Sequence, residues 1–296
     1  MAKPLSRCFL LKNILTQMAK ILIIGCGDLG TAIATRLFSA GHTLIGVRKS
    51  NQLLPRGMQT IQADVTQDNA LDMLVNIQPN IVIYCVSAEG ATDALYQAAY
   101  VQGLKNVLAT QANNAHLQHV FFVSSTRVYG QLSEELLDET MPAITTDFGG
   151  ERLLEAENVL NTCSCNSTSL RLSGIYGAGR LYLVNMAKDF AKWPQHNNYS
   201  NRIHRDDAAS FIAFLAEKVA NNQAVANCYI VTDNMPTPQY EVLTWLANQQ
   251  QIDTSHITVP PAKGGKRLNN KRLRETGFTL QYPNYQAGYR EILQNL

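Results

Sequence analysis

The sequence predicts an α/β protein with a doubly wound parallel sheet and a smaller C-terminal lobe. Over the first 170 residues, short apolar runs alternate with amphipathic helical runs, which is typical of a parallel sheet covered on both faces. A second observation is the segment Lys20–Gly30, KILIIGCGDLG, in which an apolar strand leads into a glycine-rich turn and a helix. After residue 173 the alternation becomes irregular, which places the lobe there.

Each element of the first part has its own signal, because strands are short apolar runs and helices are longer runs with one polar face. The predicted strands are Ile21–Ile24, Leu44–Val47, Thr60–Ala63, Ile81–Val86, Val120–Ser124 and Ser169–Leu172. The predicted helices are Thr31–Ala40, Asn69–Asn76, Ala91–Gln111 and Arg152–Asn161. The carboxyl ends of parallel strands share one edge of the sheet, so the loops that follow the strands should form the ligand crevice.

The smaller lobe is expected over residues 173–296, with returns to the main sheet near residues 205–232. Its predicted elements are a glycine-rich turn at 174–179, a helix Asp207–Ala220 with Asp207 as its N-cap, a strand Cys228–Val231 and a helix Thr237–Gln249. Beyond residue 266 we expect a helix, a turn at Thr276-Gly277, a stop at Tyr282-Pro283 and a short final helix.

The glycine motif in residues 25–30 is the strongest functional signal in the chain. Gly25 permits a tight turn, Gly27 lets a pyrophosphate approach the backbone, and Gly30 lets the helix pack closely on its strand. The free N–H groups at the helix start then face the phosphates. Because a strand precedes the motif and a second strand follows its helix, residues 18–172 are predicted to form a Rossmann-type NAD(P)-binding domain.

The end of the second strand indicates which nicotinamide cofactor is bound. A carboxylate there binds the ribose hydroxyls of NAD and repels the 2′-phosphate of NADP. In this chain Arg48 and Lys49 follow the strand, and no acidic residue occurs from Thr43 to Gln59. Because both cations form charge-assisted hydrogen bonds with phosphate, the sequence favours NADP, with NAD as the alternative.

Composition excludes several other classes. A formal net charge of +2 over 296 residues argues against a nucleic-acid surface. One basic cluster is interpreted as a solvated helix face: Lys263, Lys266, Arg267, Lys271, Arg272 and Arg274. The six cysteines lack metal-ligand spacing, so we expect reduced structural thiols and no metal site.

No apolar run approaches the roughly 18 residues that span a bilayer, so a cytoplasmic protein without membrane contact is expected. Residues 1–17 are basic and precede Met18, which lies just before the first strand. We interpret them as a disordered extension or an upstream start. A targeting peptide is less favoured, because the apolar core is short and no small-residue cleavage site is present.

Several segments resemble the extended short-chain dehydrogenase/reductase family, the NAD-dependent epimerase/dehydratases. Asp64-Val65 resembles the family's adenine-contacting pair, and Val123–Gly130, VSSTRVYG, resembles the SSxxVYG signature of its fifth strand. Arg171–Gly177 and Ile203–Ala208 resemble the turn after its sixth strand and its later HxxD element. The resemblance runs from about residue 18 to the C-terminus. With it, the residues expected to bind the cofactor are Gly25, Gly27, Asp28, Leu29, Gly30, Arg48, Lys49, Asp64, Val65 and Ser87.

The resemblance also implies where chemistry would occur. The family uses a serine, a tyrosine and a lysine, with an asparagine on the helix after the fourth strand. Ser125 stands at the serine position. Phe148 and Arg152 occupy the tyrosine and lysine positions, and Tyr100 stands where the asparagine would be. This pattern resembles atypical members that keep the nucleotide fold and the serine strand but lose the Tyr–Lys pair.

Two functions therefore remain open. The first is an NADP-dependent enzyme of the epimerase/dehydratase or reductase type, whose substrate carbonyl or alcohol lies at Ser125. It needs a replacement proton donor, for which Tyr100 is our first choice. The alternatives are Tyr129, Tyr176 and His204. The second function is a non-catalytic NADP-binding sensor or scaffold protein, and the loss of the Tyr–Lys pair favours it. A third interpretation, a scaffold that binds no nucleotide, is disfavoured because it would leave the glycine motif without a role.

The expected partners are a small-molecule substrate of unknown class and either no second chain or one further copy of this chain. Family members often dimerise through the helices after the fourth and fifth strands, and the helix predicted over Ala91–Gln111 is apolar enough for a homodimer. Specificity in this fold depends on loop side chains, so the sequence does not name the substrate.

Overall fold

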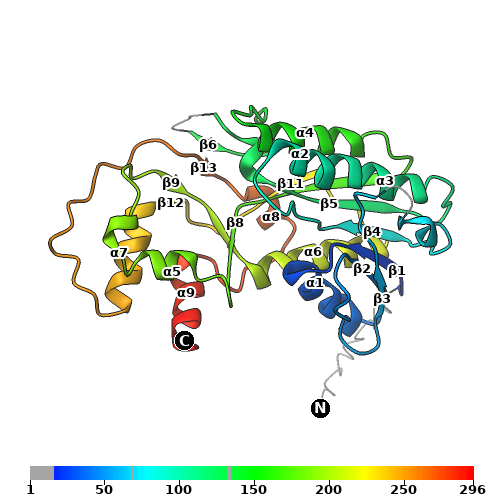
Figure 1. Cartoon of the computed structure of the whole chain (residues 1–296), viewed down its shortest axis with the longest axis horizontal. Helices are drawn as coiled ribbons and strands as arrows, with labels where there is room; N and C mark the ends of the chain where they lie inside the picture. Colours follow the sequence, from blue (N-terminus) through cyan, green and yellow to red (C-terminus); the bar gives the residue numbers. More distant parts are fainter. Residues whose placement is uncertain (1–16, 68–69, 132–134) are drawn as a thin grey trace, which may run out of the picture.

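The computed structural model describes residues 17–296 apart from 68–69 and 132–134. The extension expected over residues 1–17 therefore lies outside the described residues except for its last position. A seven-stranded sheet with the order β11-β7-β5-β4-β1-β2-β3 runs through the larger lobe (Figure 1). Its strands all pair in parallel, which confirms the predicted doubly wound α/β fold.

The strands of this sheet follow the predicted ones within three residues at each end. They are β1 (Lys20–Ile24), β2 (Thr43–Arg48), β3 (Gln59–Gln62), β4 (Ile81–Tyr84), β5 (His119–Ser125), β7 (Asn166–Leu172) and β11 (Cys228–Val231). From Ile21 to Ile24 in β1, and throughout β4, every side chain is fully buried. Helices on both faces cover these central strands, which explains why they are continuously apolar.

Two layers of helices cover the sheet. They are α1 (Asp28–Ser39), α2 (Asp93–Tyr96), η3 (Gln97–Gln102), α3 (Gly103–Thr110), α4 (Phe148–Leu160) and α6 (Arg205–Ala220). In Figure 1, α2, α3 and α4 lie above the sheet, whereas α1 and α6 lie below it. Ile21 and Ile23 belong to the core between the sheet and helices α1 and α6. Leu22 and Ile24 belong to the core on the opposite face of the sheet. Successive strand side chains point to opposite faces, so β1 contributes to both cores.

The helix predicted over Ala91–Gln111 is one helical run from Asp93 to Thr110. Its start is capped by Thr92, whose side chain accepts the N–H of Leu95. The central segment η3 is π-helical, a geometry that often marks functional sites because it shifts the side chains that follow. Tyr100 lies within this segment.

Two other predicted helices differ from the structure. The helix expected from Arg152 begins four residues earlier, at Phe148, because the Asp147 side chain accepts the N–H of Gly150 at 2.9 Å and caps it. The helix predicted over Asn69–Asn76 is wrong: its described part contains only a short 3-10 turn, η2 (Asp72–Leu74). That turn has no side-chain cap.

The prediction that Asp207 caps its helix is also wrong. The cap of α6 is His204, whose Nδ1 accepts the N–H of Asp206 at 3.2 Å. Asp207 lies in the first turn and is only 1% exposed. Its carboxylate accepts the N–H groups of Gln281 and Tyr282 at 2.7 and 2.8 Å, which ties the C-terminal segment to α6. Burial raises the pKa of this carboxyl, against the two hydrogen bonds that lower it.

The smaller lobe, at the left of Figure 1, is built from short strands and helices around a core of its own. Its elements are β8 (Gly174–Tyr176), α5 (Tyr182–Met186), η5 (Phe190–Lys192), β9 (Tyr199–Ser200), β10 (Arg202–His204), β12 (Thr237–Pro238), α7 (Gln239–Gln249) and α9 (Tyr285–Gln294). Three short elements lie against the larger lobe: β6 (Leu136–Leu137), β13 (Arg267–Leu268) and α8 (Lys271–Glu275). Nowhere in the described chain is a helix long and apolar enough to cross a membrane.

Candidate functional site

The glycine motif forms a tight turn between β1 and α1. Gly25 has a φ of +91°, and a Cβ there would lie 2.6 Å from the carbonyl carbon of Cys85. The N–H groups of Gly25 and Cys26 both donate to the Val47 carbonyl, at 2.9 and 3.0 Å. A side chain at this position would therefore collide with backbone, and the turn is rigid.

The start of α1 is suited to an anion. Gly27 is its N-cap and provides no side-chain cap, and a Cβ on Gly27 would meet no atom within 4 Å. Gly30 packs so closely that a Cβ there would lie 2.3 Å from the Gly25 carbonyl oxygen. The first N–H groups of a helix lack partners within the helix and favour negative charge. The residues present thus fit the pyrophosphate of a dinucleotide.

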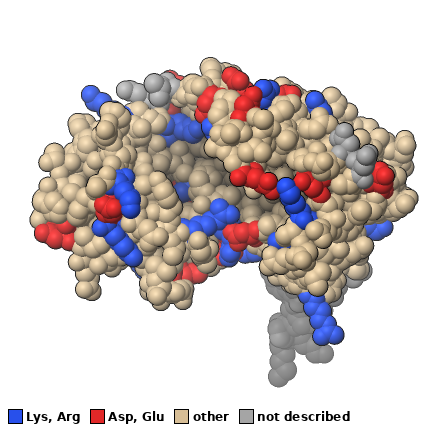
Figure 2. Space-filling view, in the orientation of Figure 1, with Lys and Arg blue, Asp and Glu red and all other residues tan. Residues whose placement is uncertain are grey.

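Three chambers follow the carboxyl ends of the strands, and Figure 2 shows the molecule hollowed between its two lobes. The first, of about 480 Å³, contains Gly25, Gly27, Arg48, Lys49, Asp64, Val65 and Ser87. The second, of about 280 Å³, contains Gly25, Gly27, Asp28, Leu29, Gly30, Ser87, Tyr100 and Ser125. The structure thus brings all ten predicted cofactor residues and both predicted catalytic residues into one continuous crevice.

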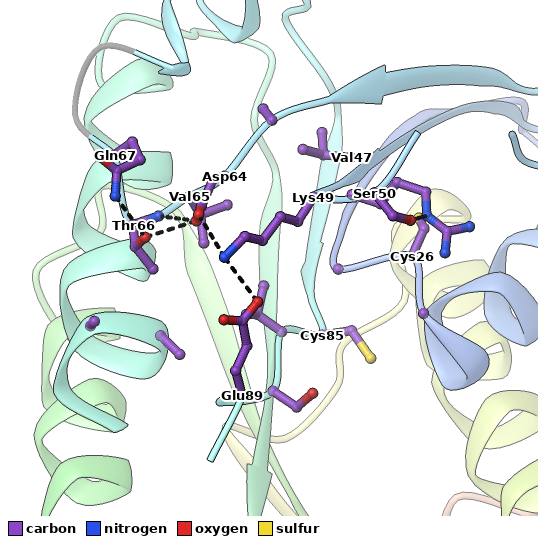
Figure 3. A pocket seen from close by; sticks show the side chains of 18 of the residues that line it. Cys26, Val47, Lys49, Ser50, Asp64, Val65, Thr66, Gln67, Cys85 and Glu89 are labelled. Atoms are coloured by element: carbon purple, nitrogen blue, oxygen red, sulfur yellow. Dashed lines mark hydrogen bonds and ion pairs between the residues drawn. The ribbon is translucent and has the colours of Figure 1, made fainter. Parts of the chain in front are cut away.

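The two cations of the first chamber, Arg48 and Lys49, have different kinds of partner. Lys49 reaches between Asp64 and Glu89, at 3.1 and 2.9 Å, as Figure 3 shows. Hydrogen bonds to Glu89 and Asp64 raise the pKa of Lys49. Arg48 instead has neutral partners, since its Nε donates to Ser50 Oγ at 3.0 Å and its Nη2 to Gln52 Oε1 at 2.8 Å. Within the described part of the chain, Arg48 therefore has no carboxylate partner, whereas Lys49 has two.

The guanidinium of Arg48 also lies near the glycine turn. Burial raises the pKa of the Cys26 thiol to about 12, and the positive charge of Arg48 opposes that rise. Cys26 belongs to the turn itself and lines the first chamber together with Arg48 and Ser50. A ligand that occupies the turn would therefore meet Arg48 at the same end of the chamber.

The second chamber contains the predicted chemistry. Ser125 ends β5, and its Oγ accepts the N–H of Arg127 at 3.2 Å. Tyr100 faces the same chamber from η3. Burial raises the pKa of the Tyr100 phenol, against a hydrogen bond from the Ala88 backbone and the charge of Arg127. A tyrosine and a serine therefore share a cavity with the glycine motif.

The positions of the family's tyrosine and lysine are occupied by side chains with other contacts. Arg152 binds Asp93 at 2.7 Å and Glu155 at 2.8 Å, and it lines neither the second nor the third chamber. The ring of Phe148 lies edge-on to Tyr96, with centroids 5.4 Å apart. Neither side chain reproduces the proton transfer that a tyrosinate and an ammonium perform.

The other candidate donors have structural roles. Tyr129 is fully buried, and its hydroxyl contacts Arg171 Nη1 at 2.6 Å. Tyr176 stacks on Tyr289 with centroids 4.4 Å apart, and His204 caps α6. Neither Tyr176 nor His204 lines any of the three chambers. Tyr100 lines the second chamber together with Ser125, whereas Tyr129 lines the third chamber with Ser125 but has its hydroxyl engaged by Arg171.

The third chamber, of about 490 Å³, lies between the lobes and shares Ser125 with the second. It is lined by Arg127 and Asp147 from the larger lobe and by Asn201 and Lys266 from the smaller one.

Lys266 was assigned to a solvated helix face on sequence grounds, and that interpretation is wrong. Burial lowers the pKa of its amine to about 8. The signal in the sequence was the preceding pair Gly264-Gly265, whose positive φ values of 73° and 71° a helix does not adopt.

An ion-pair cluster links the smaller lobe to the glycine motif. Arg180 Nε and Arg205 Nη1 bind the two carboxylate oxygens of Asp28 at 3.0 and 2.9 Å. Arg180 also lines the second chamber, and Arg205 opens α6. The smaller lobe therefore contributes a cation beside the start of α1. In the part of the chain that the structure describes, no group of His, Cys, Asp and Glu could hold a metal ion.

Comparison with known proteins agrees with this architecture. Residues 21–228 match the sequence model of the NAD dependent epimerase/dehydratase family. A candidate NAD-dependent epimerase/dehydratase from Methylobacillus flagellatus is 46% identical, with 94% of this chain and 98% of that chain covered and a TM-score of 0.85. A comparison with curated protein sequences gives no significant match.

More distant structures share the fold. The Bordetella bronchiseptica enzyme WbmG, in complex with NAD and UDP, is 16% identical, with 94% of each chain covered and a TM-score of 0.75. The UDP-glucose 4-epimerase of Thermus thermophilus, in complex with NAD, is 17% identical, with 93% of this chain and 98% of that chain covered and a TM-score of 0.74.

Proposed function

The chain belongs to the NAD-dependent epimerase/dehydratase family, and we propose that it is an NADP-dependent enzyme of the oxidoreductase or epimerase/dehydratase type that acts on a small molecule held at Ser125. One observation carries the proposal: the cofactor crevice and the interlobe chamber meet at this serine. A cofactor along the crevice would present its nicotinamide to the second chamber. A substrate would enter from the third.

The preference for NADP rests on Arg48. Among the described residues its guanidinium has neutral hydrogen-bond partners, Ser50 and Gln52, at 3.0 and 2.8 Å. A phosphate can therefore bind Arg48 without displacing a carboxylate, and Ser50 supplies a further hydroxyl donor. The distant structural relatives named above were solved with NAD. The proposal of NADP for this chain is supported by the basic residue at the end of β2.

In this proposal Tyr100 transfers the proton. A reduced nicotinamide bound along the glycine motif would supply the hydride for reduction of a substrate carbonyl. The Tyr100 hydroxyl gives its proton to the carbonyl oxygen, while the Ser125 hydroxyl donates a hydrogen bond to the same oxygen. Burial raises the pKa of Tyr100, so the phenol is in its acidic form at neutral pH.

Nucleotide titration tests the cofactor assignment. Wild-type protein should bind NADPH about tenfold or more tightly than NADH in isothermal titration calorimetry, and Arg48→Asp should reverse the order. The matched control is Arg56→Asp, which makes the same charge change at an exposed position of the β2–β3 loop. Equal binding of the two nucleotides by wild-type protein would contradict the proposal for NADP.

A non-catalytic NADP-binding sensor or scaffold remains the second candidate, because Phe148 and Arg152 replace the Tyr–Lys pair. The two functions differ in whether hydride leaves the cofactor. The protein is incubated with NADPH deuterated at C4 and a mixture of small carbonyl acids, and mass spectrometry measures deuterium in the products. An enzyme transfers deuterium to a product, whereas a sensor binds NADPH and transfers none.

A further inference from the structure

Lys266 is positioned by unusual backbone geometry. Gly264 and Gly265 have φ values of +73° and +71°, and a Cβ on Gly265 would lie 2.3 Å from the Tyr199 carbonyl oxygen. The Asn201 amide donates to the Lys266 carbonyl at 2.7 Å and accepts the N–H of Leu268 at 3.0 Å. The chain is therefore fixed on both sides of Lys266, and this fixed backbone directs its side chain into the third chamber.

The amine at the end of this side chain is only partly satisfied. Lys266 Nζ donates to the carbonyl oxygens of Thr126 and Tyr129, both at 2.7 Å. An ammonium has three N–H donors, so one remains for a ligand. Both partners are neutral, and the carboxylate whose charge acts on this amine, Asp147, is bound by Arg127. Thr126 directly follows Ser125, so the amine lies beside the strand end where the substrate oxygen is expected.

The other charges of the third chamber cancel each other. Arg127 Nε binds Asp147 at 2.9 Å, and these two groups are the charges that act on Lys266, with Asp147 raising its pKa and Arg127 lowering it. Burial outweighs both and lowers the pKa to about 8. Lys266 is thus a desolvated cation that an incoming anion would stabilise.

We propose that Lys266 binds an anionic oxygen group of the substrate, a carboxylate or a phosphate, in the third chamber, while the reacting carbon of the same molecule lies at Ser125. This inference rests on the proposed function for the role of Ser125. The binding of an anion at Lys266 can be measured without it. The substrate would then be a small oxyanion and not a neutral alcohol or aldehyde.

Binding at this lysine should be coupled to proton uptake. Near pH 8 the free protein holds Lys266 partly as the neutral amine, whereas an anion binds the ammonium. The bound state therefore takes up a proton between about pH 8 and 10, and apparent affinity falls as pH rises through this range. Calorimetry in two buffers of different ionisation enthalpy measures the protons taken up.

The experiment titrates malonate and inorganic phosphate, separately, into the full chain with NADPH present. The wild-type protein should bind one of them, which identifies the oxyanion, and should take up protons at pH 8.5. Lys266→Met should weaken this binding about tenfold or more, and Lys266→Arg should retain it. The control Lys263→Met removes an exposed lysine of the same loop and should bind like wild type.

The outcomes separate this proposal from the proposed function. No binding of either anion, or equal binding by wild type and Lys266→Met, overturns the proposal, as does equal loss in Lys263→Met. Lys266→Arg keeps the charge, so its binding also shows that the loss in Lys266→Met is one of charge and not of folding. NADPH is titrated alone into each variant. If anions bind at Lys266 and NADPH does not bind, the proposed function fails and the anion site stands.

Discussion

The two ends of the crevice each hold a lysine, and the two lysines are in opposite environments. Lys49, in the first chamber, is exposed and bound by two carboxylates, which raise its pKa. Lys266, in the third chamber, is half-buried with two backbone carbonyls as partners, and its pKa falls to about 8. A lysine side chain is thus paired with carboxylates in the first chamber and bound only by neutral carbonyl groups in the third. The difference teaches that only contacts, and not residue type, distinguish a binding cation from a solvated one.

The largest expected effect is at the junction between the two ends. Tyr100→Phe should lower deuterium transfer from labelled NADPH by about 10²- to 10⁴-fold, because the proton donor is removed, and should leave NADPH affinity unchanged. Oxidation of the alcohol by wild-type protein should accelerate as pH rises, since burial raises the pKa of the phenol that must act as the base.

The control for this variant is Tyr182→Phe, which removes a phenol hydroxyl from a residue that is 73% exposed in the smaller lobe. It should transfer deuterium at the wild-type rate. If Tyr100→Phe does so as well, Tyr100 only packs against its neighbours, and the donor is another group.

A second prediction concerns the rigidity of the first chamber. Gly25→Ala should weaken NADPH binding about 100-fold or more and lower stability, because its Cβ would lie 2.6 Å from backbone atoms of residue 85. Gly41 has a similar φ of +98° with no atom near its Cβ position. Gly41→Ala should therefore cost only about 1 kcal/mol of stability and retain NADPH binding, as urea unfolding and calorimetry would show. If both variants lose equal stability and NADPH affinity, the strain of the positive φ angle, and not crowding of the Cβ atom, causes the loss.

The two lysines should also differ in how stability depends on pH. Lys266 has a depressed pKa in the folded state, so the unfolded chain binds more protons between about pH 8 and 10.5. Wild type should therefore gain stability relative to Lys266→Met across this window, on the order of 1–3 kcal/mol. Urea unfolding at pH 7.5 and 9.5 measures the change. A constant difference would contradict the burial of the amine.

Lys49 should show the opposite sign. Its pKa is raised in the folded state, so its contribution is present below the ordinary lysine pKa and is lost as pH rises through the folded value. Because this lysine is exposed, the effect should be small, and Lys49→Met should also leave malonate and phosphate binding unchanged. If Lys49→Met lost anion binding, Lys49 and Lys266 could not be distinguished as a carboxylate-bound lysine and an anion-binding lysine.

The last prediction concerns a residue outside the crevice. Asp233 is buried, and burial raises the pKa of its carboxyl to about 7. The folded state therefore binds more protons than the unfolded state from about pH 4 to 7, and the buried carboxylate destabilises the fold above that range. Asp233→Asn should raise the melting temperature at pH 8 by a few degrees, with the difference narrowing as pH falls toward 5. A difference that widens at low pH would contradict this assignment.

Prediction from sequence worked where the signal is local. The glycine motif and the apolar strands are contiguous in the chain, so the sheet and the glycine turn between β1 and α1 followed from residue spacing, although α1 begins at Asp28 and not at Thr31 as predicted. The position of Asp207 was misjudged because its partners, Gln281 and Tyr282, are more than 70 residues away. Lys266 was missed for the same reason, since its acceptors at residues 126 and 129 are 140 and 137 residues away. Contacts between the lobes leave no periodic pattern in the sequence.

The most direct test is a crystal structure of the protein with NADP⁺ and malonate bound together. The 2′-phosphate should contact Arg48, the nicotinamide should lie between Tyr100 and Ser125, and a malonate carboxylate should accept a hydrogen bond from Lys266 Nζ. A nicotinamide ring inside the third chamber, or malonate bound away from Lys266, would contradict the arrangement of cofactor and substrate on opposite sides of Ser125.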